Sequence, residues 1–176
     1  GAEHLEGFGS LEAAARAEGE LFAALPSDGV AVLNADDAFA GLWRDMTVAR
    51  IVTCGLGSKA DFSARDIHTT SDRQGFATRF VMHTPQGTVD IELALAGKHN
   101  VINALGAAAA AVTAGATLEQ VAAGLAAMRP VAGRLQWRST SCGASLIDDS
   151  YNANPSSMQA AIDVLANQSA RRWLVI

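Results

Sequence analysis

The densest group of side chains that could bind a ligand follows the apolar residues 145–147. Residues 148–154 supply Asp149, Tyr151, Asn152 and Asn154, together with a second aspartate at 148. Carboxylates, a phenol and amides at this density exceed what a turn requires, and they suit hydrogen bonding to a polar ligand such as a ribose. A strand that runs into such a loop and then a helix is how open α/β sheets build ligand sites. The alternative is a well-capped connection that binds nothing.

A helix is predicted after this loop, because apolar residues at positions 158, 161, 162 and 165 form one stripe. Two helix starts remain open: Asn154 caps the helix with Pro155 at its first position, or Ser156 and Gln159 form a capping box. Residues 173–176 are predicted to form a further strand, which gives one βαβ unit. One such unit cannot cover both faces of a parallel sheet, so this domain is expected to be incomplete.

Two asparagines three residues apart, Asn100 and Asn103, open a helix predicted over 100–114. This spacing places both side chains on the same side of the first helical turn. A carboxamide presents a donor and an acceptor together, which matches the edge of a purine such as adenine. The alternative for Asn100 is a plain helix N-cap.

Three further residues are candidates because of their charge and position. Arg134 follows a break in the helical pattern at 130–133, where a guanidinium at a hinge could reach a phosphate; the alternative is a surface arginine. Glu18 lies on the apolar face of a helix predicted from its cap at residue 10 to residue 25, where a carboxylate is costly to bury unless it is paired. The alternative is a glutamate that reaches solvent from the edge of that face. His4 could bind a cation, although a metal site needs several converging ligands.

The remaining pattern predicts the elements that position these residues. Strands are expected at 30–33 and 51–53 with a short helix between them, and alternation before and after residues 85–87 predicts a β-hairpin. A second helix over 117–128 completes a helical hairpin. The break at 130–133 divides the chain into domains at 1–133 and 134–176, and the fold class is α/β.

The segment from Gly55 and Gly57 to Ala60 formally fits the dinucleotide fingerprint G-x-G-x-x-A. The residues that follow alternate in the manner of a strand, and no acidic residue ends a next strand about 20 positions later, so a turn is the better interpretation. The sequence contains no G-x-x-x-x-G-K-[ST] phosphate loop.

Composition limits the classes of partner. The 176 residues are 49% hydrophobic, which is enough for a buried core, and the net charge of -5 argues against a nucleic-acid partner. Cys54 and Cys142 are isolated, which favours a reducing compartment, and we expect the cytoplasm. No apolar stretch is long enough to span a membrane. The chain begins without Met and is expected to be part of a longer protein.

Five segments, 4–10, 34–37, 97–105, 130–134 and 148–158, together resemble the Mur ligase family over nearly the whole chain. The D-D-S-Y-N-A-N-P-x-S-M segment is similar to the MurF type. The resemblance implies the second half of the central ATPase domain, a sheet with a β-hairpin and a helical hairpin, followed by the first βαβ unit of a Rossmann-like carboxyl-terminal domain. The amino-terminal UDP-binding domain and the phosphate loop would be missing.

The resemblance also implies an activity, which uses ATP and Mg²⁺ to join D-alanyl-D-alanine to UDP-N-acetylmuramoyl-tripeptide in peptidoglycan precursor synthesis, in a monomer. It implies that His4 binds magnesium, that Asn100 and Asn103 contact adenine, that Arg134 contacts phosphate and that Asp149 contacts ribose.

Many members of the family carry a carbamylated lysine where this chain has Glu18, and we hypothesise that Glu18 supplies the same negative charge. Two other functions remain open: an NAD-type Rossmann module that uses Gly55 and Gly57, and a Mur-like domain without catalytic activity.

Overall fold

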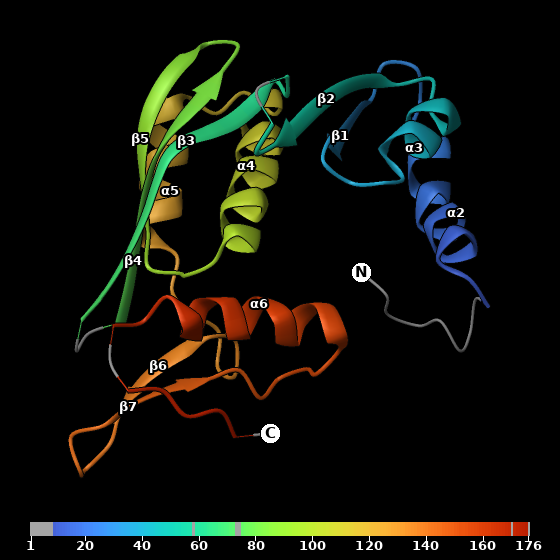
Figure 1. The fold of residues 1–176 in the computed structure, drawn as a ribbon. Coiled ribbons are helices and arrows are strands. Elements are labelled where there is room, and N and C mark those ends of the chain that lie inside the picture. The colour runs from blue at the N-terminus through green and yellow to red at the C-terminus, as the bar shows by residue number, and fades with distance from the viewer. Residues whose placement is uncertain (1–8, 58, 73–74, 170, 176) are drawn as a thin grey trace.

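The computed structural model describes residues 9–57, 59–72, 75–169 and 171–175. Within these residues, one mixed sheet is built from five strands in the order β1-β2-β3-β4-β5, and β6 and β7 form a separate two-stranded sheet (Figure 1). The elements are, in chain order, α2 (Leu11–Ala23), β1 (Val30–Asn34), α3 (Ala40–Met46), β2 (Arg50–Gly55), β3 (Phe62–Asp72), β4 (Gly75–Thr84), β5 (Gly87–Leu93), α4 (Lys98–Thr113), α5 (Leu118–Ala127), β6 (Gln136–Ser139), β7 (Ser145–Asp148) and α6 (Pro155–Ala166).

The five-stranded sheet changes direction along its width. β1 and β2 are parallel from the Val30–Arg50 pair to the Asn34–Cys54 pair, and β2 meets β3 in parallel only at its end. β3, β4 and β5 are antiparallel, and the predicted β-hairpin is confirmed as β4 and β5. The parallel half therefore places the carboxyl ends of β1 and β2 at the same edge of the sheet.

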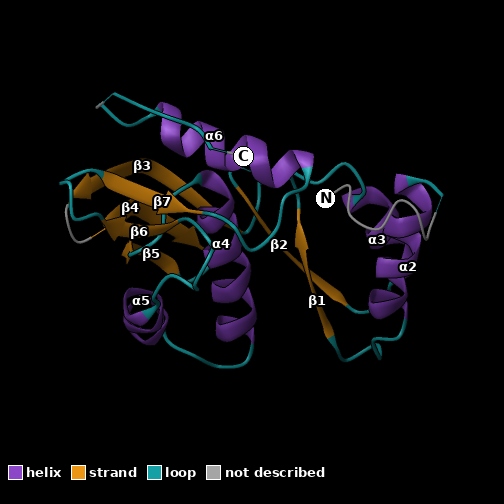
Figure 2. Ribbon diagram, turned by 90° about the horizontal axis from the view of Figure 1, so that it is seen from below, coloured by secondary structure: helices purple, strands orange, loops and turns teal. Residues whose placement is uncertain are grey.

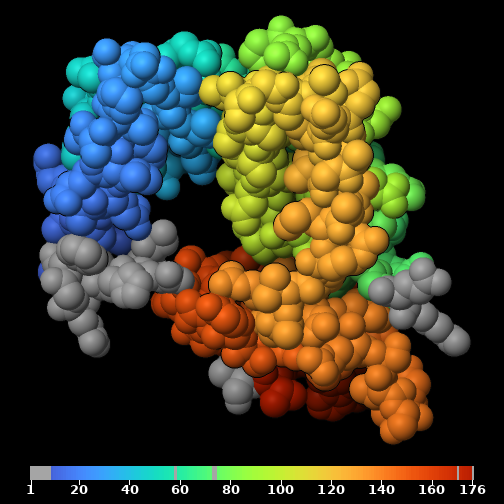
Figure 3. All heavy atoms as spheres, turned by 180° about the vertical axis from the view of Figure 1, so that it is seen from behind, coloured from blue at the N-terminus to red at the C-terminus, as the bar shows by residue number. Residues whose placement is uncertain are grey.

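Helices cover both sides of the parallel half (Figure 2). α4 contacts β1, β2 and β3, and α5 contacts β5, so the predicted helical hairpin lies on one face. Alternation in β1 buries Leu33 on the other side, in a cluster with Ala15 of α2 and Trp43 of α3. Figure 3 shows α4 and α5 side by side above the segment that follows residue 133.

The contact between α2 and α3 depends on Gly19. A Cβ atom at this position would lie 2.5 Å from Sδ of Met46 and 3.0 Å from Cδ1 of Trp43. The indole nitrogen of Trp43 donates a 2.7 Å hydrogen bond to the carbonyl of Ala15. Gly19 therefore allows α2 to approach α3 more closely than a residue with a side chain would.

Glu18 is exposed, so the expectation that its carboxylate lies on a buried apolar face is wrong. The main neighbour of α2 is α3, which it meets through small residues such as Ala15 and Gly19, and Glu18 lies outside that contact. The helix also ends at Ala23, two residues earlier than predicted.

The second unit differs from a plain βαβ arrangement. β7 and α6 form as predicted, but β7 pairs with β6 in an antiparallel hairpin, from Gln136–Asp148 to Ser139–Ser145. The strand expected at 173–176 is not formed over the described residues 171–175, which are exposed. A strand requires a neighbour whose backbone accepts and donates its hydrogen bonds, and these residues pair with none in the described part of the chain. The division into domains at residue 133 stays a prediction.

A small apolar cluster joins the second unit to the five-stranded sheet. It contains Phe76 at the start of β4, Leu135, Val164 of α6 and the half-buried Trp137, whose ring meets Phe76 edge-on at 5.2 Å between centroids. The loop residue Ala96, directly before the N-cap of α4, is also buried in this cluster. The contact brings the loop after β7 towards the start of α4.

No helix in the described part of the chain has both the length and the apolar character needed to cross a membrane.

Candidate functional site

The start of α4 is organised around Gly97 rather than Asn100. Gly97 is the N-cap residue and has φ +92, a conformation that favours glycine, so Asn100 lies inside the first turn. A Cβ atom at Gly97 would lie 2.6 Å from Cε1 of His99. The N-cap alternative for Asn100 is therefore wrong.

The side chain of Asn100 is already bonded within the chain on its donor side. Its Nδ2 donates a 2.7 Å hydrogen bond to the carbonyl of Ala96 and lies 3.1 Å from Nε2 of His99. Since Nδ2 is a donor, Nε2 must accept, which requires a neutral imidazole with its proton on Nδ1. Only the oxygen of Asn100 is left for a ligand. Asn103, one turn later, is exposed.

The pKa of His99, at the start of α4, is influenced by Asp149 in the loop after β7. Burial lowers the pKa of His99, and the Asp149 carboxylate opposes that shift. The Asp149 charge is thus close enough to act on the residue next to Asn100. The two segments also meet through packing: Ala96 shares a buried cluster with Leu135 and Val164, and a Cβ atom at Gly97 would lie 3.4 Å from Cγ2 of Val164.

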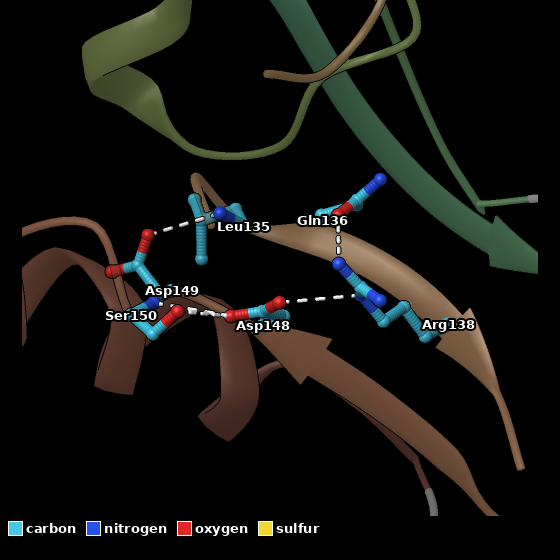
Figure 4. A network of polar contacts seen from close by, with 6 residues as sticks. All are labelled: Leu135, Gln136, Arg138, Asp148, Asp149 and Ser150. Carbon is cyan, nitrogen blue, oxygen red and sulfur yellow. Dashed lines mark hydrogen bonds and ion pairs between the residues drawn. The ribbon is translucent and has the colours of Figure 1, made fainter. Parts of the chain in front are cut away.

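Asp149 also holds the junction between the two units (Figure 4). Its Oδ1 accepts a 2.9 Å hydrogen bond from the backbone nitrogen of Leu135. Gly133 (φ +71) and Leu135 (φ +47) both have backbone conformations in the left-handed region, and Tyr151 donates its backbone N–H to the Gly133 carbonyl at 3.0 Å. The second oxygen of Asp149 has no hydrogen-bond partner within the described residues.

The neighbouring Asp148 stabilises the loop rather than offering a free carboxylate (Figure 4). It accepts hydrogen bonds from the hydroxyl of Ser150 at 2.7 Å and from the Ser150 backbone, and it forms a 3.2 Å ion pair with Arg138. The Ser150 hydroxyl and N–H lower the pKa of Asp148. Sequence reasoning missed Arg138 and Gln136, which Arg138 contacts at 2.9 Å, because β6 was not predicted.

The guanidinium of Arg134 lies over the ring of Tyr151, 4.1 Å from its centroid. Both residues are exposed, with 64% of Tyr151 accessible. This cation–π interaction holds the arginine at the surface, next in sequence to Leu135, whose N–H bonds Asp149.

Asn152 and Asn154 have local partners in this loop. Asn154 caps α6, with its Oδ1 accepting from the backbone nitrogen of Ser157 at 2.8 Å and Pro155 at the first helical position. The first of the two predicted helix starts is thus confirmed, with a capping box to Ser157. Asn152 accepts a 2.8 Å bond from the Ala153 backbone. Roles for both asparagines in ligand binding stay predictions.

Two of the predicted site residues are not brought into this group. Glu18 is on α2, which Figure 1 shows beside α3 and away from α6, and His4 lies outside the described residues. Across the described ranges, no group of three or more His, Cys, Asp or Glu side chains could hold a metal ion.

The glycines of the apparent dinucleotide fingerprint leave room for the carboxylate of Asp36. A Cβ atom at Gly55 would lie 2.8 Å from Oδ2 of Asp36, and that oxygen accepts a 2.6 Å bond from the Leu56 backbone. The segment after Gly57 continues into β3, whereas a Rossmann fingerprint needs a helix there. The NAD-type alternative is therefore not favoured.

The fold and the site together define a class of α/β protein. In this class, the first turn of a helix in one unit lies near a polar loop of the following unit. Residues 1–111 match the family described as Mur ligase middle domain, and residues 133–176 match the Mur ligase, glutamate ligase domain. The chain belongs to the Mur ligase family.

Similar proteins include the UDP-N-acetylmuramoyl-tripeptide--D-alanyl-D-alanine ligase of Escherichia coli (strain K12), 45% identical over 99% of this chain and 38% of its own length. A crystal structure of MurF from Acinetobacter baumannii is 35% identical, with a TM-score of 0.87 over 96% of this chain and 36% of that one. A MurF ligase from Thermotoga maritima in complex with ADP, 23% identical, shares the fold with a TM-score of 0.78 over 94% of this chain and 37% of its own. This chain spans little more than a third of each.

Proposed function

We propose that this chain is part of an ATP-dependent ligase that joins D-alanyl-D-alanine to UDP-N-acetylmuramoyl-tripeptide in peptidoglycan precursor synthesis. The observation that carries the proposal is a shared contact: Leu135, whose N–H bonds Asp149, packs in one buried cluster with Ala96. Ala96 lies just before α4, whose first two turns carry Asn100 and Asn103. The 45% identity to the Escherichia coli ligase over almost the whole chain supports the same reaction.

In this proposal the chain binds the nucleoside end of ATP. The exposed amide of Asn103 and the oxygen of Asn100 would contact adenine, and the second oxygen of Asp149 would accept from a ribose hydroxyl. Arg134, held over Tyr151, would contact a phosphate. Support comes from the ligand that the Thermotoga maritima relative was solved with, which is ADP.

The reaction we propose has two steps. A carboxylate oxygen at the end of the tripeptide attacks the terminal phosphorus of ATP, which gives an acyl phosphate and releases ADP. The amine of D-alanyl-D-alanine then attacks the acyl carbon, phosphate leaves, and an amide forms with loss of a proton. The sequence lacks a phosphate loop, so we expect a segment outside this chain to hold the phosphates.

Magnesium belongs to this proposal as the ion that would neutralise charge on the transferred phosphoryl group. Among the described residues, no three His, Cys, Asp or Glu side chains converge in a way that could hold the ion. His4 stays our candidate ligand, and exposed Glu18 stays our candidate for the charge that a carbamylated lysine gives elsewhere. A cytoplasmic location and a monomeric state are also proposals.

The proposal is tested by assaying the full-length protein for phosphate release that requires ATP and both peptide substrates together. Formation of the joined product supports the ligase. Binding of ATP without any product, under conditions where the Escherichia coli relative turns over, would instead support a Mur-like domain without catalytic activity. Glu18→Gln should reduce turnover, and added bicarbonate should not change the turnover of the parent protein. If Glu18→Gln turns over as the parent does, Glu18 does not replace the carbamylated lysine.

A further inference from the structure

We propose that His99 is a positioning residue that makes Asn100 an acceptor-only contact and so sets the preference of the site for adenine over guanine. This inference rests on the proposed function, because it concerns the same nucleotide. It is carried by two contacts of one amide group.

The first contact fixes which way the Asn100 amide points. Its Nδ2 lies 2.7 Å from the carbonyl oxygen of Ala96, and Ala96 is buried with 1% of its surface accessible. Turning the amide over would set Oδ1 against that carbonyl, which places two acceptors together. The nitrogen must therefore face Ala96.

The second contact uses the remaining N–H of the same nitrogen. It is directed at Nε2 of His99, 3.1 Å away. Both donors of Asn100 are then engaged, and its oxygen has no donor within the residues that the structure describes. Without an acceptor at position 99, the amide keeps only one of the two bonds that hold it.

The imidazole is itself held in place. Its Cε1 and Nδ1 atoms lie 2.6 Å and 2.8 Å from where a Cβ of Gly97 would stand, so the ring occupies space that only glycine leaves open. Gly97 also has φ +92, which fixes the backbone before the ring. His99 thus has a defined location next to Asn100.

The chemistry of the purines gives this arrangement a consequence. The exocyclic group of adenine is an amine that donates, whereas that of guanine is an oxygen that accepts. An amide that can only accept bonds the adenine amine and opposes the guanine oxygen. A site with unpaired polar atoms rejects the wrong ligand strongly, because those atoms lose their bonds to water without replacement.

The test compares ATP with GTP in the full-length protein, using His99→Phe, His99→Gln and the matched control His68→Phe. Phenylalanine keeps a ring against Gly97 but has no acceptor, whereas the glutamine oxygen can accept from Asn100. His68 is exposed on β3. We expect His99→Phe to raise the KM for ATP by about three- to tenfold and to reduce the ATP-to-GTP ratio of kcat/KM by about tenfold, with a smaller change in kcat. His99→Gln should restore both values, and His68→Phe should match the unchanged protein.

An unchanged ATP-to-GTP ratio in His99→Phe overturns the inference, as does equal loss in the Phe and Gln variants, which would assign His99 to packing alone. If circular dichroism shows that His99→Phe is unfolded, His99→Met provides the same comparison with a flexible apolar side chain. A parent protein that makes no product with either nucleotide would count against the proposed function instead, so the two failures are distinguishable.

Discussion

The carboxylate of Asp149 accepts the backbone N–H of Leu135 at 2.9 Å, across the junction between the two units. Leu135 has φ +47, and its side chain is 5% accessible in the cluster with Phe76 and Val164. A left-handed backbone is unfavourable for leucine, so the bond to Asp149 and the burial of the side chain together maintain it. One oxygen of this carboxylate thus stabilises the junction, and the other has no hydrogen-bond partner within the described residues.

Removal of this carboxylate should destabilise the junction. Asp149→Ala leaves the Leu135 N–H without its partner, and we expect a loss of about 1–3 kcal/mol in the free energy of unfolding, read from urea denaturation of the full-length protein. Asp149→Asn keeps an oxygen that can accept from Leu135 and should recover most of that loss. Equal stability of the Ala variant and the parent would show that the bond contributes nothing.

Tyr151 should act through Arg134. Tyr151→Phe retains the ring under the guanidinium and should leave the KM for ATP close to the parent value. Tyr151→Ala removes the ring and should raise the KM about two- to fivefold, since an exposed cation–π contact is worth about 0.5–1 kcal/mol. In an Arg134→Ala background the Tyr151→Ala change should add nothing; additive effects in that double variant contradict the coupling.

Gly19 and Gly124 provide a matched pair of glycine substitutions inside helices. Gly19→Ala forces a methyl group onto Met46 and Trp43 and should destabilise the protein by about 1–3 kcal/mol, despite the better helix propensity of alanine. A Cβ at Gly124 on α5 has no atom within 4 Å, so Gly124→Ala should stabilise by about 0.5–1 kcal/mol. Thermal melts of both variants check the sign of each effect, and the same sign for both would refute the packing described at α2.

Asp61 makes the stability of the β2–β3 turn depend on pH. The Thr53 backbone N–H and hydroxyl donate to its carboxylate at 2.8 Å and 2.7 Å, and they lower its pKa below 3.8. The folded state then binds its proton less readily than the unfolded state, so the stabilisation is full above the unfolded pKa and is lost as the pH falls through the folded one.

Asp61→Ala should therefore cost about 1 kcal/mol at pH 7, a modest value because the group is exposed. The difference from the parent should shrink as the pH falls below the unfolded pKa of the carboxyl group. Urea unfolding midpoints of the two proteins at each pH make the comparison. A difference that stays constant with pH would mean that the charge of Asp61 does not contribute.

The sequence predicted features that depend on neighbours along the chain. The predicted cap at residue 10 is confirmed, since Ser10 accepts from the backbone nitrogen of Ala13, and a cap uses residues within one turn. The β4–β5 hairpin was equally readable, since period-two alternation and a short turn are local signals.

Features that depend on distant contacts were not predictable in the same way. The pairing of β6 with β7 joins Gln136 to Asp148, and nothing in either short segment identifies the other as its partner. The exposure of Glu18 follows from where α3 lies, and the loss of the Asn100 donors to Ala96 and His99 follows from the path of the chain before α4. Neither fact can be predicted from the pattern of residues within one helix.

We propose that Asn103 and Asp149, from two different units, contact the nucleoside of one ATP molecule. The most direct measurement is the KM for ATP of the full-length protein carrying Asn103→Ala, Asp149→Asn or both. Each single variant should raise the KM about three- to tenfold with a smaller change in kcat, because each removes or weakens about one hydrogen bond to the nucleoside. If all three variants bind ATP as the parent does while product formation continues, the proposed nucleotide site is not where this structure places these residues.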